Sequence, residues 1–168
     1  MNEIYEVKNG RLILCDPELG IAIDEPFDLP PHRSLDPDTQ ISSSCFYLEG
    51  LLHGPSRYFY KDKQVSVSWF YHGKRHGKMV QHYPSGALSS VQTFCHGLPE
   101  GLHRFYYEDG VLRTEMRYFH GLLHGEMKLY WPSGSLKRFV TFEKGKKIGI
   151  EKFFSEEGAV TEEIVHAS

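Results

Sequence analysis

The sequence predicts an all-β fold, an elongated open antiparallel sheet built from about five stacked β-hairpin repeats of 23–24 residues. The first observation is a pair of glycines, four residues apart, that recurs with a step of 23 residues once and 24 residues three times. The second is an alternation of apolar and polar residues between the pairs, which is typical of half-buried strands. The pairs are Gly50/Gly54, Gly73/Gly77, Gly97/Gly101, Gly121/Gly125 and Gly145/Gly149.

Other residue types keep the same step. A lone glycine follows nine residues after each pair except the first, and an aromatic residue stands three residues before each pair, at Tyr47, Phe70, Phe94, Tyr118 and Phe142. The first unit has Asp62-Lys63 in a turn one residue shorter. Terminal units of repeat arrays are often irregular, so this exception fits a repeat protein.

Residues 1–43 form an acidic segment, with nine acidic and three basic side chains. Asn9-Gly10 lies between two short β-prone runs and predicts a hairpin, which we expect to cap the first repeat and cover a sheet edge. From Glu25 to Ser44 the composition changes to proline, aspartate and serine. This stretch predicts a linker or an extended strap.

Residues 44–168 are expected to form the repeat array with an acidic C-terminal tail. In residues 112–119 the apolar and charged side chains alternate, which predicts one strand of a hairpin. The other strand precedes the lone glycine, as in residues 102–107 and 126–131. Because a single sheet has no second layer, we expect the recurrent rings to stack from unit to unit and bury one another.

Composition places the chain among single-domain proteins: 40% of its 168 residues are apolar and 24% are charged. There is no apolar run near the roughly 20 residues needed to cross a bilayer, and the first residues lack the features of a signal peptide. We therefore expect a cytoplasmic protein. Its three cysteines, without any CxxC pair, are expected to be reduced thiols.

The recurrent motif resembles that of a known family. The stretch Tyr107-Glu108-Asp109-Gly110-Val111-Leu112, followed by Tyr118-Phe119-His120-Gly121-Leu122-Leu123-His124-Gly125, is similar to the MORN repeat, in the variant form common in bacterial proteins. Some proteins of this variant type are described as antitoxin-like. The resemblance covers about residues 45–160 and implies a twisted sheet of hairpins with a groove, used as a protein-binding scaffold, a dimerisation module or a contact with acidic lipid.

Histidines in the turns raise the question of a metal site, because His72/His76 and His120/His124 are four residues apart. That spacing presents two ligands to one ion on a helix, but here both pairs lie in glycine turns. We expect these histidines to bond turn backbone, and we expect no metal or cofactor. Nucleophile-elbow and phosphate-loop motifs are also missing from the sequence, so it is not expected to be an enzyme.

Binding is the remaining class of function. Aromatic residues give rigid contact area, and the candidates for contact with a partner protein are Trp69, Tyr71, Tyr83, Tyr107, Tyr118 and Trp131. Trp69 and Tyr71 lie off the main periodic columns and are the better candidates. A basic cluster near the C-terminus is the candidate for acidic lipid or an acidic partner: Lys137, Arg138, Lys144, Lys146, Lys147 and Lys152.

The sequence favours a non-enzymatic scaffold that binds another protein along its groove or at its ends. Two alternatives are open: peripheral binding to acidic phospholipid, and an antitoxin-like role in neutralising a toxin. Nucleic acid is disfavoured, because the formal net charge is -3 and there is no motif that enters a groove of the duplex. The sequence does not decide between a monomer and a homodimer.

Overall fold

The computed structural model describes residues 2–167, which form strands and turns only. Three strands at the N-terminus, β1 (Ile4–Lys8), β2 (Arg11–Asp16) and β3 (Ile21–Pro26), form a separate antiparallel sheet, here called the N-sheet. Among the described residues, no helix is long and apolar enough to cross a membrane. The other strands are β4 (His32–Asp36), β5 (Ile41–Cys45), β6 (Tyr47–Leu48), β7 (Leu51–Leu52), β8 (Gly54–Tyr60), β9 (Lys63–Tyr71), β10 (Lys74–His82), β11 (Leu88–Cys95), β12 (Leu98–Pro99), β13 (Gly101–Tyr106), β14 (Leu112–Phe119), β15 (Leu122–Tyr130), β16 (Leu136–Glu143), β17 (Lys146–Phe154) and β18 (Val160–His166).

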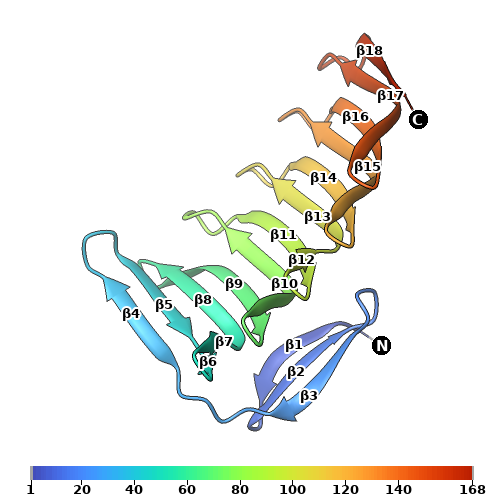
Figure 1. Cartoon of the computed structure of the whole chain (residues 1–168). Coiled ribbons are helices and arrows are strands. Elements are labelled where there is room, and N and C mark those ends of the chain that lie inside the picture. Colours follow the sequence, from blue (N-terminus) through green and yellow to red (C-terminus); the bar gives the residue numbers. More distant parts are fainter. Residues whose placement is uncertain (1, 168) are drawn as a thin grey trace.

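The second sheet is the repeat array, a 13-stranded antiparallel sheet in which strands follow one another in chain order from β4 to β18. Off this path, β12 pairs with β11 alone, and β6 and β7 form a separate two-stranded ribbon between β5 and β8. Figure 1 shows the hairpins rising as a twisted, open ladder. The predicted fold class is therefore confirmed. Below, units 1 to 5 are numbered by their glycine pairs, from Gly50/Gly54 to Gly145/Gly149.

The turns that contain the lone glycines are built alike. In the first of them, the Tyr83 amide donates to the Ala87 carbonyl and the Gly86 amide donates to the Tyr83 carbonyl, both at 2.8 Å. Gly86 has φ of 97°, a conformation that side chains disfavour, and this explains why glycine recurs there. A β-bulge precedes each of these turns, for example between Gln81 and His82. The bulge takes up the extra residue and keeps successive units in register.

Rings at the start of these turns join one unit to the next. The Tyr83 hydroxyl donates to the Tyr106 carbonyl at 2.7 Å, and the Tyr107 hydroxyl donates to the Tyr130 carbonyl at 2.9 Å. Trp131 Nε1 continues the series by donating to a carbonyl 23 residues further on, at 3.1 Å. Unit-to-unit stacking was predicted; the hydrogen bonds explain why tyrosine and tryptophan occupy this column.

The segment predicted as a linker is a β-hairpin instead. Strands β4 and β5 pair with each other, and β5 pairs with β8, so they extend the array at its N-terminal edge. Pro26 ends β3 and Pro37 lies in the β4–β5 turn, positions where proline disturbs no interior strand bond. The carboxylate of Asp36 accepts the amide of Asp38 at 3.0 Å and closes that turn. Only residues 27–31 connect the N-sheet to the array, and the predicted boundary at residue 43 falls inside β5.

The first unit also differs slightly from expectation. Its short turn is Lys61–Asp62 rather than Asp62-Lys63, and both residues have positive φ, at 47° and 63°. Two consecutive left-handed residues make the type I′ turn that suits the twist of a hairpin. The absence of the lone glycine in unit 1 is therefore a change of turn type.

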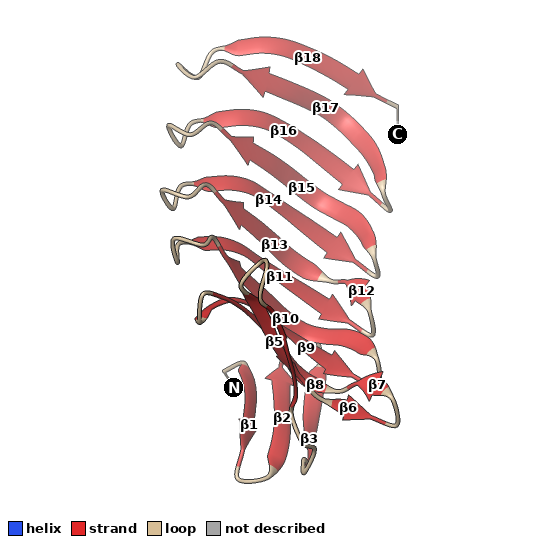
Figure 2. Ribbon diagram, turned by 90° about the vertical axis from the view of Figure 1, so that its left-hand side faces the viewer, coloured by secondary structure: helices blue, strands red, loops and turns tan. Residues whose placement is uncertain are grey.

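The main apolar cluster lies between the N-sheet and the array. Leu12, Leu14, Ile21 and Phe27 from the N-terminal segment are buried against Trp69 of β9. Figures 1 and 2 show the N-sheet beside the N-terminal half of the array and away from β14–β18. The predicted hairpin is thus a three-stranded second layer on a face of the array, and it does not cover an edge.

Candidate protein-binding face

The two glycines of each pair have different neighbours. A Cβ added to the first glycine would touch a side chain of the preceding unit, that of the residue after its first glycine. A Cβ on Gly73 would lie 3.3 Å from the Leu51 side chain, and one on Gly121 would lie 3.4 Å from the Leu98 side chain. The amide of Gly73 also donates to the Leu52 carbonyl at 2.8 Å. The first glycines therefore let successive turns stack closely.

The second glycines of units 1 to 3 face the N-sheet segment. A Cβ on Gly54 would lie 2.7 Å from the Phe27 ring, and one on Gly77 would overlap the Tyr5 ring. At Gly101 the neighbour is Leu19, at 3.3 Å. Phe27, Tyr5 and Leu19, here called the knobs, thus occupy hollows that only glycine leaves.

Each hollow has a second wall, the side chain four residues before the first glycine of the pair. In unit 1 this is Phe46, whose ring centroid lies 5.1 Å from that of Phe27. In unit 2 it is Trp69, with its ring centroid 6.0 Å from that of Tyr5. In unit 3 it is Thr93. We call each second glycine with this wall a glycine notch.

Within the part of the chain that the structure describes, the notches of units 4 and 5 hold no knob. A Cβ on Gly125 would have only Arg117 Cδ within 4 Å, at 3.9 Å, and a Cβ on Gly149 would meet nothing within 4 Å. Phe119, beside the Gly125 notch, is 54% exposed. Phe119 stands 48 residues after Tyr71 in the repeat frame, so it occupies the same position in an uncovered unit. The sequence analysis missed Phe119, although the signal that singled out Tyr71 applies to it.

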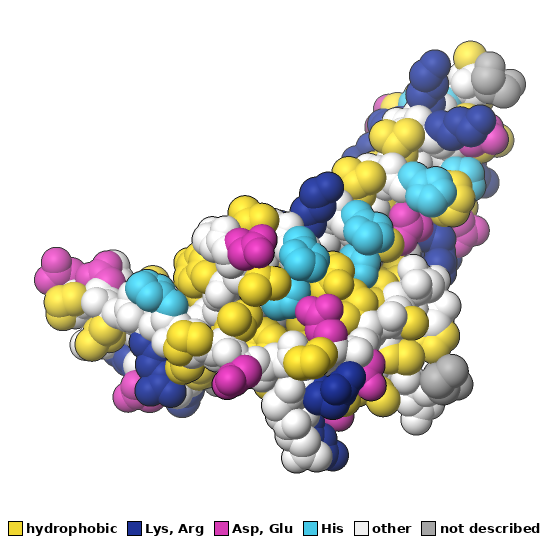
Figure 3. Space-filling view, turned by 60° about the horizontal axis from the view of Figure 1, so that its bottom comes forward, with side chains coloured by type: hydrophobic (Ala, Val, Ile, Leu, Met, Phe, Trp, Pro, Cys, Tyr) yellow, Lys and Arg dark blue, Asp and Glu magenta, His cyan; other side chains and the backbone are white. Residues whose placement is uncertain are grey.

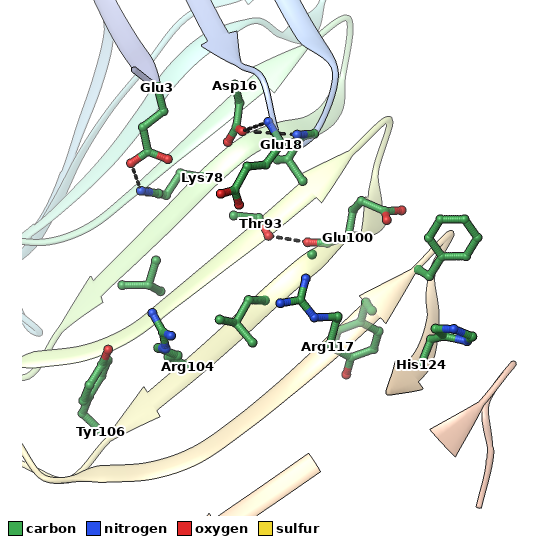
Figure 4. Close-up of a pocket in the computed structure, with 16 residues that line it drawn as sticks. Glu3, Asp16, Glu18, Lys78, Thr93, Glu100, Arg104, Tyr106, Arg117 and His124 are labelled. Atoms are coloured by element: carbon green, nitrogen blue, oxygen red, sulfur yellow. Dashed lines mark hydrogen bonds and ion pairs between the residues drawn. The ribbon is translucent and has the colours of Figure 1, made fainter. Parts of the chain in front are cut away.

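A groove of about 570 Å³ lies where the N-sheet meets the array. Its wall on the N-sheet carries Glu3, Asp16 and Glu18, and its wall on the array carries cationic side chains, among them Arg104 and Arg117 (Figure 4). Arg104 Nε pairs with a carboxylate of its own sheet at 2.7 Å. Arg117 is exposed and makes no ion pair within residues 2–167. The groove thus pairs an acidic wall with one that is basic apart from Glu100.

The knobs are accompanied by carboxylates that contact the array. Glu3, two residues before Tyr5, forms an ion pair with Lys78. Glu25, two residues before Phe27, accepts hydrogen bonds at 2.8 Å from His53 and at 3.1 Å from the Tyr71 hydroxyl. Glu18, directly before Leu19, lines the groove. All three knobs therefore follow a glutamate by one or two residues. The feature that the three share is an apolar knob beside a negative charge.

Tyr5 is held by Asp16 within the N-sheet. Its hydroxyl donates to Asp16 Oδ2 at 2.6 Å. Burial, together with this hydrogen bond, raises the pKa of the Tyr5 hydroxyl. The ring is thereby fixed as a neutral knob.

Two turn histidines, His53 and His76, bond the backbone of the next unit, but the prediction fails for His124, whose buried Nδ1 has no hydrogen-bond partner in residues 2–167. His53 Nδ1 accepts the amide of His72 at 3.2 Å, and His76 Nδ1 accepts the amide of His96 at 3.0 Å. In unit 3 a glutamate replaces the histidine, and its Oε2 accepts the next amide at 2.7 Å. Figure 3 shows the histidines in a row along the array. Glu100 can replace histidine here because its carboxylate also reaches the amide of the next unit.

Three possible metal ligands do come together at His76, Cys95 and His96, with ligand atoms within 4.8 Å of one another. The one lone pair of the neutral His76 ring already accepts the His96 amide. Burial, with a smaller contribution from His96, lowers the pKa of His76, and burial followed by Glu100 raises the pKa of the Cys95 thiol. The arrangement favours a neutral ring and a protonated thiol, whereas metal binding requires a thiolate and a free nitrogen.

The six aromatic candidates all have neighbours within the chain. Trp69 is 6% exposed, so a partner cannot reach its ring while the N-sheet is docked. Tyr71 is hydrogen-bonded to Glu25, and Tyr83, Tyr107 and Trp131 form the bonds between units described above. The ring of Tyr118 lies 4.7 Å from that of His103 and also lines the groove. Trp69 and Tyr71 do mark an interface, but it is an interface with the chain's own N-sheet.

The predicted basic cluster is largely engaged by acidic and aromatic groups. Arg138 and Lys147 bind Glu151, which is fully buried, and His166 Nε2 bonds it at 2.7 Å. Burial alone would raise the pKa of Glu151, but hydrogen bonds from His166, Lys147 and Arg138 outweigh burial and lower it to about 2. The remaining members differ: Lys152 pairs with Glu163 at 3.1 Å, Lys137 Nζ lies 4.1 Å from the Trp131 ring centroid, and Lys144 and Lys146 are exposed.

A continuous sheet of glycine-closed hairpins, open on its C-terminal units, defines a β-hairpin repeat scaffold. Residues 99–120 and 123–144 match the family model described as MORN repeat variant. This part of the chain is therefore built of MORN repeat variants, and the units on either side keep the same glycine frame. No curated protein matches the chain.

Proposed function

We propose that the protein is a non-enzymatic scaffold that binds another protein on the face to which its N-sheet is docked. The observation that carries the proposal is that this face already holds a β-sheet in three glycine notches while two further notches are open. A surface that accepts one set of apolar knobs can accept another of similar chemistry. The exposed Phe119 and the unpaired Arg117 give the open part of the face an apolar and a charged contact.

Binding of acidic lipid is less well supported. Arg138, Lys147 and Lys152 already pair with carboxylates and Lys137 lies over the Trp131 ring, which leaves Lys144 and Lys146 as the exposed lysines of the cluster with neither contact in residues 2–167. Two lysines contribute only about 1 kcal/mol each at an anionic surface. Charge reversal at both lysines, followed by flotation with phosphatidylserine vesicles, tests this alternative.

An antitoxin-like role rests on the family resemblance alone. The matched family model describes the repeat and not a toxin partner. If this role holds, the toxin is the protein that the scaffold covers, so the same experiment addresses both ideas.

The experiment is photo-crosslinking in the native host from three exposed positions of the full chain. Phe119 reports on the open face, Val165 on the C-terminal edge strand and Leu35 on the N-terminal edge strand. We expect a discrete adduct with another protein from Phe119 and none from the two edges. An adduct only from Val165 or Leu35 would move the contact to the ends of the array, and no adduct from any position would contradict the scaffold function.

A further inference from the structure

In the docked N-sheet each knob lies beside a carboxylate. The open notch of unit 4 has the features to receive another knob with its carboxylate. Gly125 provides the hollow, and its wall is the aliphatic stem of Arg117, with Cδ at 3.9 Å from the position of a Cβ on Gly125. The guanidinium at the end of that stem is exposed and has no ion pair within residues 2–167. The notch is therefore apolar at its base and cationic at its rim.

We infer that the Gly125 notch binds an extended acidic segment of a partner protein, which inserts an aromatic side chain over Gly125 and places a nearby carboxylate on Arg117. The inference rests on the proposed function and specifies its partner by chemistry. An aromatic ring fits because rings fill the notches of units 1 and 2, and because a guanidinium can lie against a ring at the wall position from which Trp69 contacts Tyr5.

The occupant is argued from continuity with the N-sheet interface. The Gly101 notch, filled by Leu19, and the Gly125 notch are one repeat apart on the same face. Two strand spacings separate them, or roughly 10 Å. Glu18, beside Leu19, and Arg117, the wall of the Gly125 notch, both line the same groove (Figure 4). A partner segment would thus extend the row of knobs that the N-sheet begins.

A carboxylate is required because an aromatic knob alone would leave Arg117 without a partner. In the N-sheet a glutamate two residues before its knob likewise contacts a basic side chain of the array, although at other positions of the repeat: Glu3 pairs with Lys78 and Glu25 with His53. A charge-assisted hydrogen bond between carboxylate and guanidinium is among the stronger polar contacts. The expected partner motif is an acidic residue one or two positions before an aromatic one.

The test uses a probe peptide taken from the chain itself, the acetylated and amidated segment of residues 2–8, which contains Glu3 and Tyr5. It is titrated to millimolar concentration into the full-length ¹⁵N-labelled protein. We expect amide shifts at Gly125, Arg117 and Phe119. A peptide with Tyr5→Ala should bind about tenfold more weakly or worse, and one with Glu3→Gln should bind measurably more weakly.

The matched protein variants are Gly125→Ala and Gly110→Ala. Both glycines have similar positive φ, 93° and 91°, so both variants bear the same backbone strain, but a Cβ on Gly110 meets nothing within 4 Å. Gly125→Ala fills the notch and should weaken the peptide about tenfold or more, whereas Gly110→Ala should leave binding within about twofold. Spectra of both variants without peptide show whether the array is folded.

Three results would overturn the inference. The peptide could produce no shifts, or it could shift Gly77 and Trp69 instead, which would mean that it displaces β1 and ignores the open notch. The full chain could also form a dimer by sedimentation that Gly125→Ala abolishes, which would make a second copy the occupant. If cross-links form only from Val165 or Leu35, the protein is still a scaffold but the Gly125 notch is not its binding site. The two proposals can therefore fail separately.

Discussion

Glycine has two separate uses in this chain, and the difference appears only at the level of single contacts. Gly73 and Gly121 permit close stacking of successive turns, whereas Gly54 and Gly77 make room for Phe27 and Tyr5. Each pair therefore combines a glycine that lets neighbouring turns stack with a glycine that leaves a hollow for a side chain from outside the array. In units 4 and 5 the hollow at the second glycine holds no side chain from residues 2–167.

We predict that Gly77→Ala destabilises the contact between N-sheet and array more than Gly86→Ala does. Both positions have positive φ, at 109° and 97°, but a Cβ on Gly77 overlaps Tyr5 whereas one on Gly86 meets nothing within 4 Å. The extra loss should be about 1–3 kcal/mol, because the Tyr5 ring must leave its notch. Urea unfolding followed by fluorescence of buried Trp69, with Trp131 replaced by phenylalanine in every protein, measures it. Equal midpoints for the two variants would refute the notch geometry.

Elements are joined to one another by side chains that reach the next unit. We predict that Tyr107→Phe lowers the free energy of unfolding by about 0.5–1.5 kcal/mol, because it leaves the Tyr130 carbonyl without the 2.9 Å bond. Tyr58→Phe is the control, since Tyr58 is 46% exposed. Chemical denaturation should separate the two variants, and similar losses from both would exclude a stabilising role for this column.

The last hairpin depends on a buried carboxylate. We predict that Glu151→Gln costs about 1–3 kcal/mol at neutral pH, because Arg138 and Lys147 lose their counter-charge but are partly exposed to water. Glu163→Gln, at an exposed pair, should cost far less. Thermal unfolding by circular dichroism measures both, and a larger loss from Glu163→Gln would refute the assignment.

The same carboxylate predicts how stability depends on acid. The folded-state pKa of Glu151 is about 2, below its ordinary value of 4.5, so the contribution is fully present above pH 4.5 and is lost as the pH falls towards 2. Glu151→Gln should remove this part of the pH dependence. If the variant and the natural protein lose stability in parallel through this range, the ion pairs do not stabilise the folded state.

At the scale of the whole molecule, the N-sheet changes an otherwise local architecture. A repeat array gains stability from contacts between neighbouring units. Here Glu3 pairs with Lys78 and Tyr5 packs on Gly77, contacts that join distant parts of the chain. Units 1 to 3 therefore have a second layer, while units 4 and 5 depend on neighbour contacts and on Glu151.

A second pH effect is expected in the middle of the array. Burial lowers the pKa of His76 and of His103. Because the unfolded chain then binds protons more readily, the stabilising effect of the neutral rings is fully present above about pH 6.5 and declines as the pH falls below it. His103→Gln should make the melting temperature depend less on pH between pH 7.5 and 5, because one histidine no longer contributes to that dependence. The exposed His32→Gln should leave the dependence unchanged. An unchanged slope in His103→Gln would contradict the effect.

The repeat frame was readable from the sequence because each turn needs glycine at a fixed position and each strand alternates. Gly86 and its equivalents predict the turns, and the rings at Tyr83 and Tyr107 predict contact between units. The β4–β5 hairpin was not predicted, because prolines at strand ends look like those of a linker. Phe119 was overlooked although it occupies the position of Tyr71 in the repeat frame; only its exposure depends on where the N-sheet stops.

By itself the sequence determined the class of fold and the number and phase of the repeats, since these depend on contacts that recur with the period. Only the tertiary structure decided that Phe27, Tyr5 and Leu19 fill the notches of units 1 to 3 and that Gly125 is left open. Those contacts join segments far apart in the chain and follow no period. Docking of the N-sheet, rather than any local preference, thus determines which part of the array is available to a partner.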